Sequence, residues 1–184
     1  YGSNLNEAHW LEWCSRRGLS CGPLRAVGPA WLHDHRLIFN RYSYGWSGGV
    51  LSIVSSRGSV VQGLLFEIAN DQLDAIDMKE GVAVNAYRRV KICVEDAAGI
   101  AHNAITYQAI AENEEINVDP SRLYLETVRE GYLARGITSA GLERAEKGKW
   151  AADVDKIFVY GTLRKGQSRG DLLLPYEVQR NSAR

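Results

Sequence analysis

The chain has 184 residues, 45% of them hydrophobic and 24% charged, and its 22 basic residues balance 22 acidic ones. This composition is typical of a globular protein whose core needs no metal or disulfide. A net charge of zero offers no field for nucleic acid or an anionic membrane, and no apolar run reaches the roughly 18 residues of a membrane span. We therefore expect a cytoplasmic protein whose partner is a small molecule, with no nucleic acid and no membrane.

The cysteines support the same expectation of a reducing compartment. Cys14, Cys21 and Cys93 are odd in number, form no CxxC pair and stand where apolar residues would also serve. The sequence therefore predicts three buried thiols.

In the first half of the chain, a turn at 1–4 is followed by a predicted helix over 6–17. Apolar residues recur there at helical spacing, and Gly18 stands where a C-terminal cap would lie. Strands are predicted over 30–39, 50–54 and 60–68, with a turn at 55–59 between the last two. A short helix over 71–79 follows, capped by Asn70 and ended by Gly81.

In the second half, strands over 90–94 and 100–110 flank a turn at 96–99 and form a predicted hairpin. Asp119 is the expected N-cap of a helix over 121–135, since Asp suits the cap and the following proline the first helical position. A further helix is predicted over 139–147.

The last residues repeat the beginning of the chain. Tyr160, Gly161, Thr162 and Leu163 follow a predicted buried strand and share the aromatic, glycine, hydroxyl and leucine pattern of residues 1–5. The pattern indicates a tandem duplication, with coincidence of a common strand-turn pattern as the alternative. The chain starts at Tyr1 without a methionine or signal peptide, so we expect a fragment of a longer protein.

These motifs resemble the γ-glutamylcyclotransferase superfamily. The Tyr-Gly-Ser-Asn loop at the start is similar to the loop that opens such domains, and the Glu80-Gly81-Val82 sequence to the end of their central helix. Tyr87 lies seven residues after Glu80, as in the family pattern, and Tyr107 matches the next hairpin strand. The resemblance covers about 140 residues. Residues 160–166 look more like the AIG2 and γ-glutamylamine branch.

The resemblance implies an α+β fold, a γ-glutamylcyclotransferase-like small mixed β-barrel with flanking helices. Residues 1–150 would form one domain that lacks its first strand, and residues 155–184 the N-terminal fragment of a second one. Residues 157–160 could fill the vacated strand position in the same chain or by strand exchange in a homodimer.

The implied reaction releases 5-oxoproline and a free amine from a γ-glutamyl compound, by attack of the substrate's own α-amine on its γ-carbonyl. Glu80 would be the general base and acid, because the α-amine is mostly an ammonium near neutral pH. We expect burial to raise its pKa, which brings proton exchange closer to neutrality. A plain solvated glutamate near a helix end is the alternative.

The same resemblance assigns substrate binding to Tyr1, Gly2, Ser3, Asn4, Tyr87 and Tyr107. Gly2 would let backbone N–H groups approach a carboxylate or oxyanion, which a Cβ would obstruct. An ordinary strand-to-helix turn and half-buried strand tyrosines are the alternatives. No cofactor and no metal are implied. Two rival functions remain: a non-catalytic ligand-binding or assembly module, and an isopeptide-type γ-glutamylamine cyclotransferase.

Overall fold

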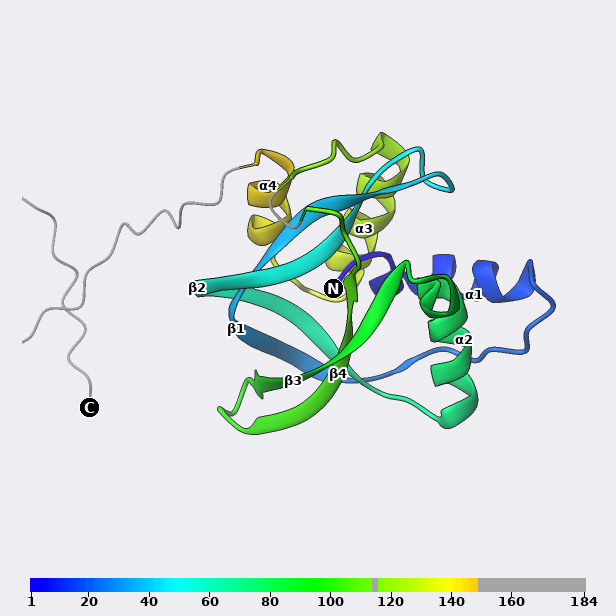
Figure 1. Cartoon of the computed structure of the whole chain (residues 1–184). Helices are drawn as coiled ribbons and strands as arrows, with labels where there is room; N and C mark the ends of the chain where they lie inside the picture. The colour runs from blue at the N-terminus through cyan, green and yellow to red at the C-terminus, as the bar shows by residue number, and fades with distance from the viewer. Residues whose placement is uncertain (114–115, 149–184) are drawn as a thin grey trace, which may run out of the picture. The chain divides into compact units, whose positions relative to one another are not determined.

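The computed structural model describes residues 1–113 and 116–148 (Figure 1). The elements follow the chain as η1 (Ser3–Leu5), α1 (Glu7–Ser15), β1 (Arg25–Ser43), β2 (Gly48–Glu67), α2 (Asn70–Glu80), η2 (Val82–Val84), β3 (Tyr87–Asp96), β4 (Ala101–Ala109), α3 (Arg122–Ala134) and α4 (Ala140–Glu146). The strands form two antiparallel hairpins, β1–β2 and β3–β4, and helices stand before, between and after them, which confirms the α+β class.

The four strands form one sheet in the order β2-β1-β3-β4, and every pairing in the described residues is antiparallel. The sheet curls until its edge strands meet. The Ala109 N–H of β4 donates to Ser52 Oγ of β2 at 2.9 Å, and Gln108 Nε2 donates to the Ile53 carbonyl at 3.1 Å. A sheet whose edges touch encloses its inner face, and this fits the γ-glutamylcyclotransferase-like fold expected from the sequence.

The predicted turn at 55–59 is wrong, because β2 continues through it as one strand of 20 residues. The partner of β1 jumps from Val60, opposite His33, to Ser55, opposite His35, so β2 carries extra residues at this point. Asp34 has a φ of 55° and its Oδ1 accepts the Gly58 N–H at 2.8 Å. Polar turn-forming residues here make a bulge, which bends a strand without ending it.

The helix caps differ in part from the predicted ones. Asn6 caps α1 by accepting the His9 N–H at 3.0 Å. Ser121, not Asp119, caps α3, since its Oγ accepts the Tyr124 N–H at 3.3 Å. The carbonyl of Asp119 instead accepts the Gly49 N–H at 2.8 Å, which joins this segment to the start of β2.

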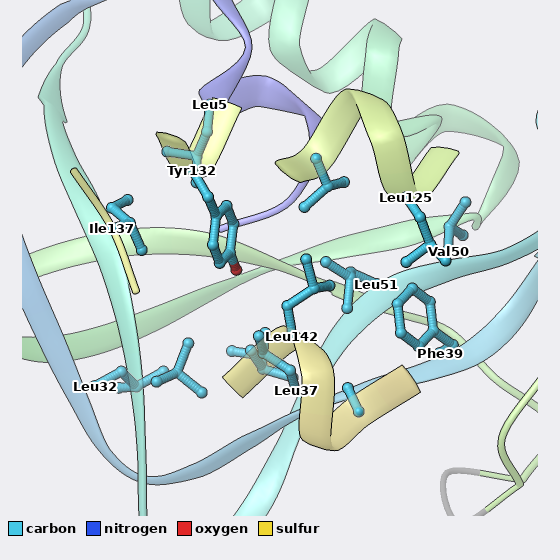
Figure 2. Packing of buried hydrophobic residues seen from close by; sticks show 14 of the residues in the cluster. Leu5, Leu32, Leu37, Phe39, Val50, Leu51, Leu125, Tyr132, Ile137 and Leu142 are labelled. Carbon is cyan, nitrogen blue, oxygen red and sulfur yellow. The ribbon is translucent and has the colours of Figure 1, made fainter. Parts of the chain in front are cut away.

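Two apolar clusters pack the helices, one against the sheet and the other between two helices. In the first, Tyr132 of α3 and Leu142 of α4 pack with Leu37, Phe39 and Leu51 of the sheet (Figure 2). The second cluster joins α1 to α2, which lie next to each other in Figure 1, and contains Trp10, Cys14, Leu24, Ala75 and Ile76. The helix carrying Glu80 is thereby fixed against the helix that follows the N-terminal loop.

The prediction of three buried thiols is wrong. Cys14 and Cys21 form a disulfide, and Cys93 is an exposed free cysteine of β3. The seven-residue separation hid the pair, because the turn after α1 brings the two Cα atoms to 5.9 Å and no sequence motif marks such a turn. No helix among residues 1–113 and 116–148 has the length and apolar character to cross a membrane. The second-copy residues Tyr160, Gly161, Thr162 and Leu163, and the strand proposed before them, lie outside the described residues.

Candidate functional site

One cleft of about 1040 Å³ collects the residues that the sequence singled out. The N-terminal loop, the end of α2 and the inner faces of the strands line it. All seven predicted residues of the described part lie on its wall: Tyr1, Gly2, Ser3, Asn4, Glu80, Tyr87 and Tyr107. The fold therefore brings together positions that are up to about 100 residues apart in the chain.

The N-terminal loop depends on Gly2 for its shape. Gly2 has φ 81° and ψ −165°, a region essentially restricted to glycine. Its carbonyl accepts the Leu5 N–H at 3.2 Å, and the Ser3 carbonyl accepts the Asn6 N–H at 3.1 Å. The chain thus turns tightly between the cleft wall and the start of α1.

Helix α3 supports this loop from behind through Gly131. A Cβ on Gly131 would lie 2.7 Å from Asn6 N and 2.8 Å from the Leu5 carbonyl carbon. Asn6 Nδ2 also donates to the Thr127 carbonyl at 3.2 Å. The loop is therefore seated directly on the helix backbone, with Leu5 fully buried beneath it.

Glu80 is the last residue of α2, and Gly81 ends the helix in the left-handed conformation with φ 66°. Asn4 Nδ2 donates to Glu80 Oε1 at 2.7 Å. Burial raises the pKa of Glu80, although the Lys79 charge and the Asn4 hydrogen bond act in the opposite direction. Glu80 is thus a carboxylate held inside the cleft by the loop, in contrast to a solvated glutamate at a helix end.

Lys79 is a site residue that the sequence analysis missed. Its Nζ donates to Asn4 Oδ1 at 2.5 Å and to Ser3 Oγ at 3.3 Å. Burial lowers its pKa to about 8, against the neighbouring charge of Glu80. A lysine in the last turn of a helix is expected to face solvent and complement the helix dipole, so no sequence signal marked it.

The hydroxyl groups of the site tyrosines donate hydrogen bonds to other groups of the protein. Tyr1 donates to the Tyr107 carbonyl, Tyr107 to Asp77 Oδ1 at 2.6 Å, and Tyr87 to the Leu51 carbonyl at 2.8 Å. Burial raises the pKa of all three phenols, so they stay protonated. Their geometry suits rigid walls whose hydroxyl oxygens can still accept a hydrogen bond.

A second group of lining residues, also missed, forms an aromatic wall. Trp46, from the turn before β2, lies 5.0 Å from the ring of His9 and 5.0 Å from that of Tyr124. Burial lowers the pKa of His9 to about 4, so this imidazole is neutral near pH 7. The wall is therefore apolar and uncharged next to the charged Lys79–Glu80 end. Its members come from α1, the β1–β2 turn and α3, and only tertiary packing joins them.

Among residues 1–113 and 116–148, no group of three or more His, Cys, Asp or Glu side chains is placed to hold a metal ion. His33 Nε2 lies 3.8 Å from Glu95 Oε2 across the β1–β3 pair, and His35 Nδ1 lies 2.8 Å from the His33 carbonyl oxygen.

Comparison with known proteins gives consistent results. The AIG2-like family matches residues 60–144. The γ-glutamylcyclotransferase of Mus musculus is 24% identical over 149 residues, and that of Bos taurus 25%, each covering 75% of both chains. A solved structure named γ-glutamyl cyclotransferase superposes with a TM-score of 0.62 at 23% identity, over 96% of each chain.

Proposed function

Since the chain belongs to the superfamily of the AIG2-like proteins and the γ-glutamylcyclotransferases, we propose that it is a γ-glutamylcyclotransferase. Its substrate would be a γ-glutamyl peptide or amine, and its products 5-oxoproline and a free amine. The observation that supports this proposal most directly is the side chain of Glu80 inside the cleft, where its Oε1 accepts a hydrogen bond from Asn4 Nδ2 at 2.7 Å.

The proposed reaction forms one C–N bond and breaks another. Glu80 takes a proton from the α-ammonium of the substrate, whose nitrogen then attacks the γ-carbonyl carbon and closes the five-membered ring. The amide bond to the amine part breaks as the tetrahedral intermediate collapses. The two protons that the α-nitrogen loses are gained by the leaving nitrogen, which departs as an ammonium, with Glu80 as the carrier. The nucleophile belongs to the substrate, so the chemistry requires no cofactor.

The cleft supports this chemistry by positioning. The loop at Gly2, Ser3 and Asn4 would bind the glutamyl head, and Tyr87 and Tyr107 would limit its movement. A curled substrate with its amine close to the γ-carbonyl has already lost much of the entropy that ring closure costs. Burial raises the pKa of Glu80, and a base whose pKa is nearer to neutrality exchanges protons more effectively.

A γ-glutamylamine of the isopeptide type, such as γ-glutamyl-lysine, is the second candidate. The cleft of about 1040 Å³ is at the upper end of ordinary ligand pockets and has room for its longer amine part. An assay in which γ-glutamyl-alanine and γ-glutamyl-lysine compete gives the ratio of their kcat/KM values.

The test is release of 5-oxoproline from these two compounds by the full chain. Glu80→Gln keeps the size of the side chain and should lower kcat at least about 100-fold, since it cannot carry the proton. Glu126→Gln, on the exposed side of α3, is the matched control and should retain activity. A folded wild-type protein that binds 5-oxoproline but forms no product would favour the non-catalytic module instead.

A further inference from the structure

Two consecutive residues of α2, Lys79 and Glu80, reach the same loop residue from opposite sides. Lys79 Nζ donates to Asn4 Oδ1 at 2.5 Å, and Asn4 Nδ2 donates to Glu80 Oε1 at 2.7 Å. The result is a continuous series of ammonium, amide and carboxylate. Lys79 also donates to Ser3 Oγ at 3.3 Å, so it contacts both polar side chains of the loop.

The chemistry of the three groups permits only one orientation of the amide. An ammonium can only donate and a carboxylate can only accept, whereas the amide of Asn4 has one end of each kind. A rotated amide would turn its NH₂ group toward the ammonium and its oxygen toward the carboxylate, and both hydrogen bonds would be lost. Lys79 therefore selects the orientation in which Asn4 donates to Glu80.

We propose that Lys79 is a positioning residue of this site, which fixes the Asn4 amide and through it the carboxylate of Glu80, and which keeps a positive charge beside the general base. This inference rests on the proposed cyclotransferase function. It adds a residue whose role depends on contacts with the loop and not on contact with the substrate.

The charges around the pair support this role. Facing Glu80 are Lys79, Asp77 and the phenols of Tyr1, Tyr87 and Tyr124. Facing Lys79 are Glu80 and Arg17, which follows α1, with neutral His9 nearby. Lys79 opposes the effect of burial, which raises the pKa of Glu80. Burial lowers the pKa of Lys79 only to about 8, so its charge is largely present at pH 7. The Lys79 charge therefore favours the carboxylate form of Glu80, which is the form that acts as a base, in a site that disfavours this charge.

The experiment compares Lys79→Met, Lys79→Gln and Lys79→Arg in the full chain. Lys91→Met, at an exposed position of β3, is the control. We expect Lys79→Met to move the acidic limb of the kcat–pH profile upward by about one pH unit. The value of kcat should fall while KM changes little. Lys79→Arg keeps a charged donor and should restore the wild-type limb. Lys79→Gln keeps a donor without the charge, so its limb should also move upward.

A second readout does not depend on turnover. In protein labelled with ¹³C at the glutamate carboxyls, the Glu80 resonance is assigned by its absence in Glu80→Gln, and its titration gives the pKa directly. Lys79→Met should raise this pKa by about one unit, and Lys91→Met should leave it unchanged. If the wild type forms no 5-oxoproline, the proposed function fails, yet this titration still tests whether Lys79 controls Glu80.

Two separate results would contradict the role of Lys79. An unchanged pKa of Glu80 in folded Lys79→Met would overturn the inference. A raised KM with an unmoved acidic limb would also overturn it, because Lys79 would then act by binding the substrate. If Lys79→Met does not fold, Lys79→Gln and Lys79→Arg decide by the same two measurements.

Discussion

At the scale of single residues, two tyrosine hydroxyls of α3 have opposite surroundings. Tyr124 Oη accepts the buried Leu51 N–H at 3.1 Å, whereas the buried Tyr132 hydroxyl has no hydrogen-bond partner among the described residues. Tyr132→Phe should therefore leave the free energy of unfolding unchanged or raise it by about 1 kcal/mol, because it removes an unsatisfied polar atom. Denaturant unfolding measures the change.

Tyr124→Phe is the matched control on the same helix. It should lower the free energy of unfolding by about 1 to 3 kcal/mol, since the Leu51 N–H would lose its acceptor inside the core. Equal losses in the two variants would show that ring packing, and not hydrogen bonding, governs both positions.

Residue-scale prediction from the sequence was uneven for physical reasons. The Gly2 loop and Glu80 were found because their pattern resembles a family motif. Lys79 was not found, because a contact between α2 and the loop spans 75 positions and leaves no local pattern. Asp119 and Ser121 are both favourable N-cap residues. Ser121 is the cap of α3, and the Asp119 carbonyl accepts the Gly49 N–H.

At the scale of elements, the contact between α3 and η1 predicts a large effect of Gly131→Ala. A new Cβ would lie 2.7 to 2.8 Å from backbone atoms of Leu5 and Asn6, which cannot move without shifting the loop. We expect a loss of about 1 to 3 kcal/mol in the free energy of unfolding, despite the better helix propensity of alanine. The proposed cyclotransferase activity should fall more steeply, because the shift separates Asn4 from Glu80. Leu133→Ala, at a side chain of the same helix that is 84% exposed, is the control and should change neither quantity much.

The disulfide at the end of α1 gives a second element-scale prediction. Cys14–Cys21 closes a short loop, and a loop of this length corresponds to about 2 to 3 kcal/mol of stabilisation in the chain-entropy treatment. Thermal unfolding with and without a thiol reductant should show a lower Tm in the reduced protein. The double variant Cys14→Ser with Cys21→Ser should show no dependence on the reductant, and Cys93→Ser should behave as the wild type. A reductant-independent wild type would contradict the prediction.

Most elements could be predicted from the sequence, while the length of β1 and β2 could not. Helix periods and glycine ends located α1, α2 and α3 to within a few residues. The bulge at Asp34 and Gly58 was read as a turn, because both features use the same residue types. Only the pairing of β2 with β1 on both sides of the bulge distinguishes them.

At the scale of the whole molecule, the raised pKa of Glu80 means that the site lowers the stability of the fold. Burial makes the native state hold the Glu80 proton more tightly than the unfolded state does. Stability from this group is therefore fully present below the unfolded pKa of about 4.5 and is lost as pH rises through the native pKa. Glu80→Gln, which can still accept from Asn4, should have a higher Tm than the wild type at pH 7.

The raised pKa of Glu80 also predicts how the difference in Tm between Glu80→Gln and the wild type depends on pH. The gap in Tm between Glu80→Gln and the wild type should close below about pH 4, where both states of the wild type bind the proton. Glu126→Gln, at an exposed pair, provides the baseline. A Glu80→Gln protein less stable than the wild type at pH 7 would show that the carboxylate is stabilised by the cleft.

The sequence by itself determined the order of the elements, because periodicity and caps are local properties, and its resemblance to a family indicated the α+β class and the two parts of the proposed site. Only the tertiary structure decided that the Tyr1–Asn4 loop and the end of α2 face one cleft, that Asn4 accepts from Lys79 and donates to Glu80 there, and that Cys14 and Cys21 are joined. The physical reason is that such contacts arise from packing: α1 against α2 through Trp10 and Ile76, and the loop against the backbone of Gly131. No pattern along the chain records these distances.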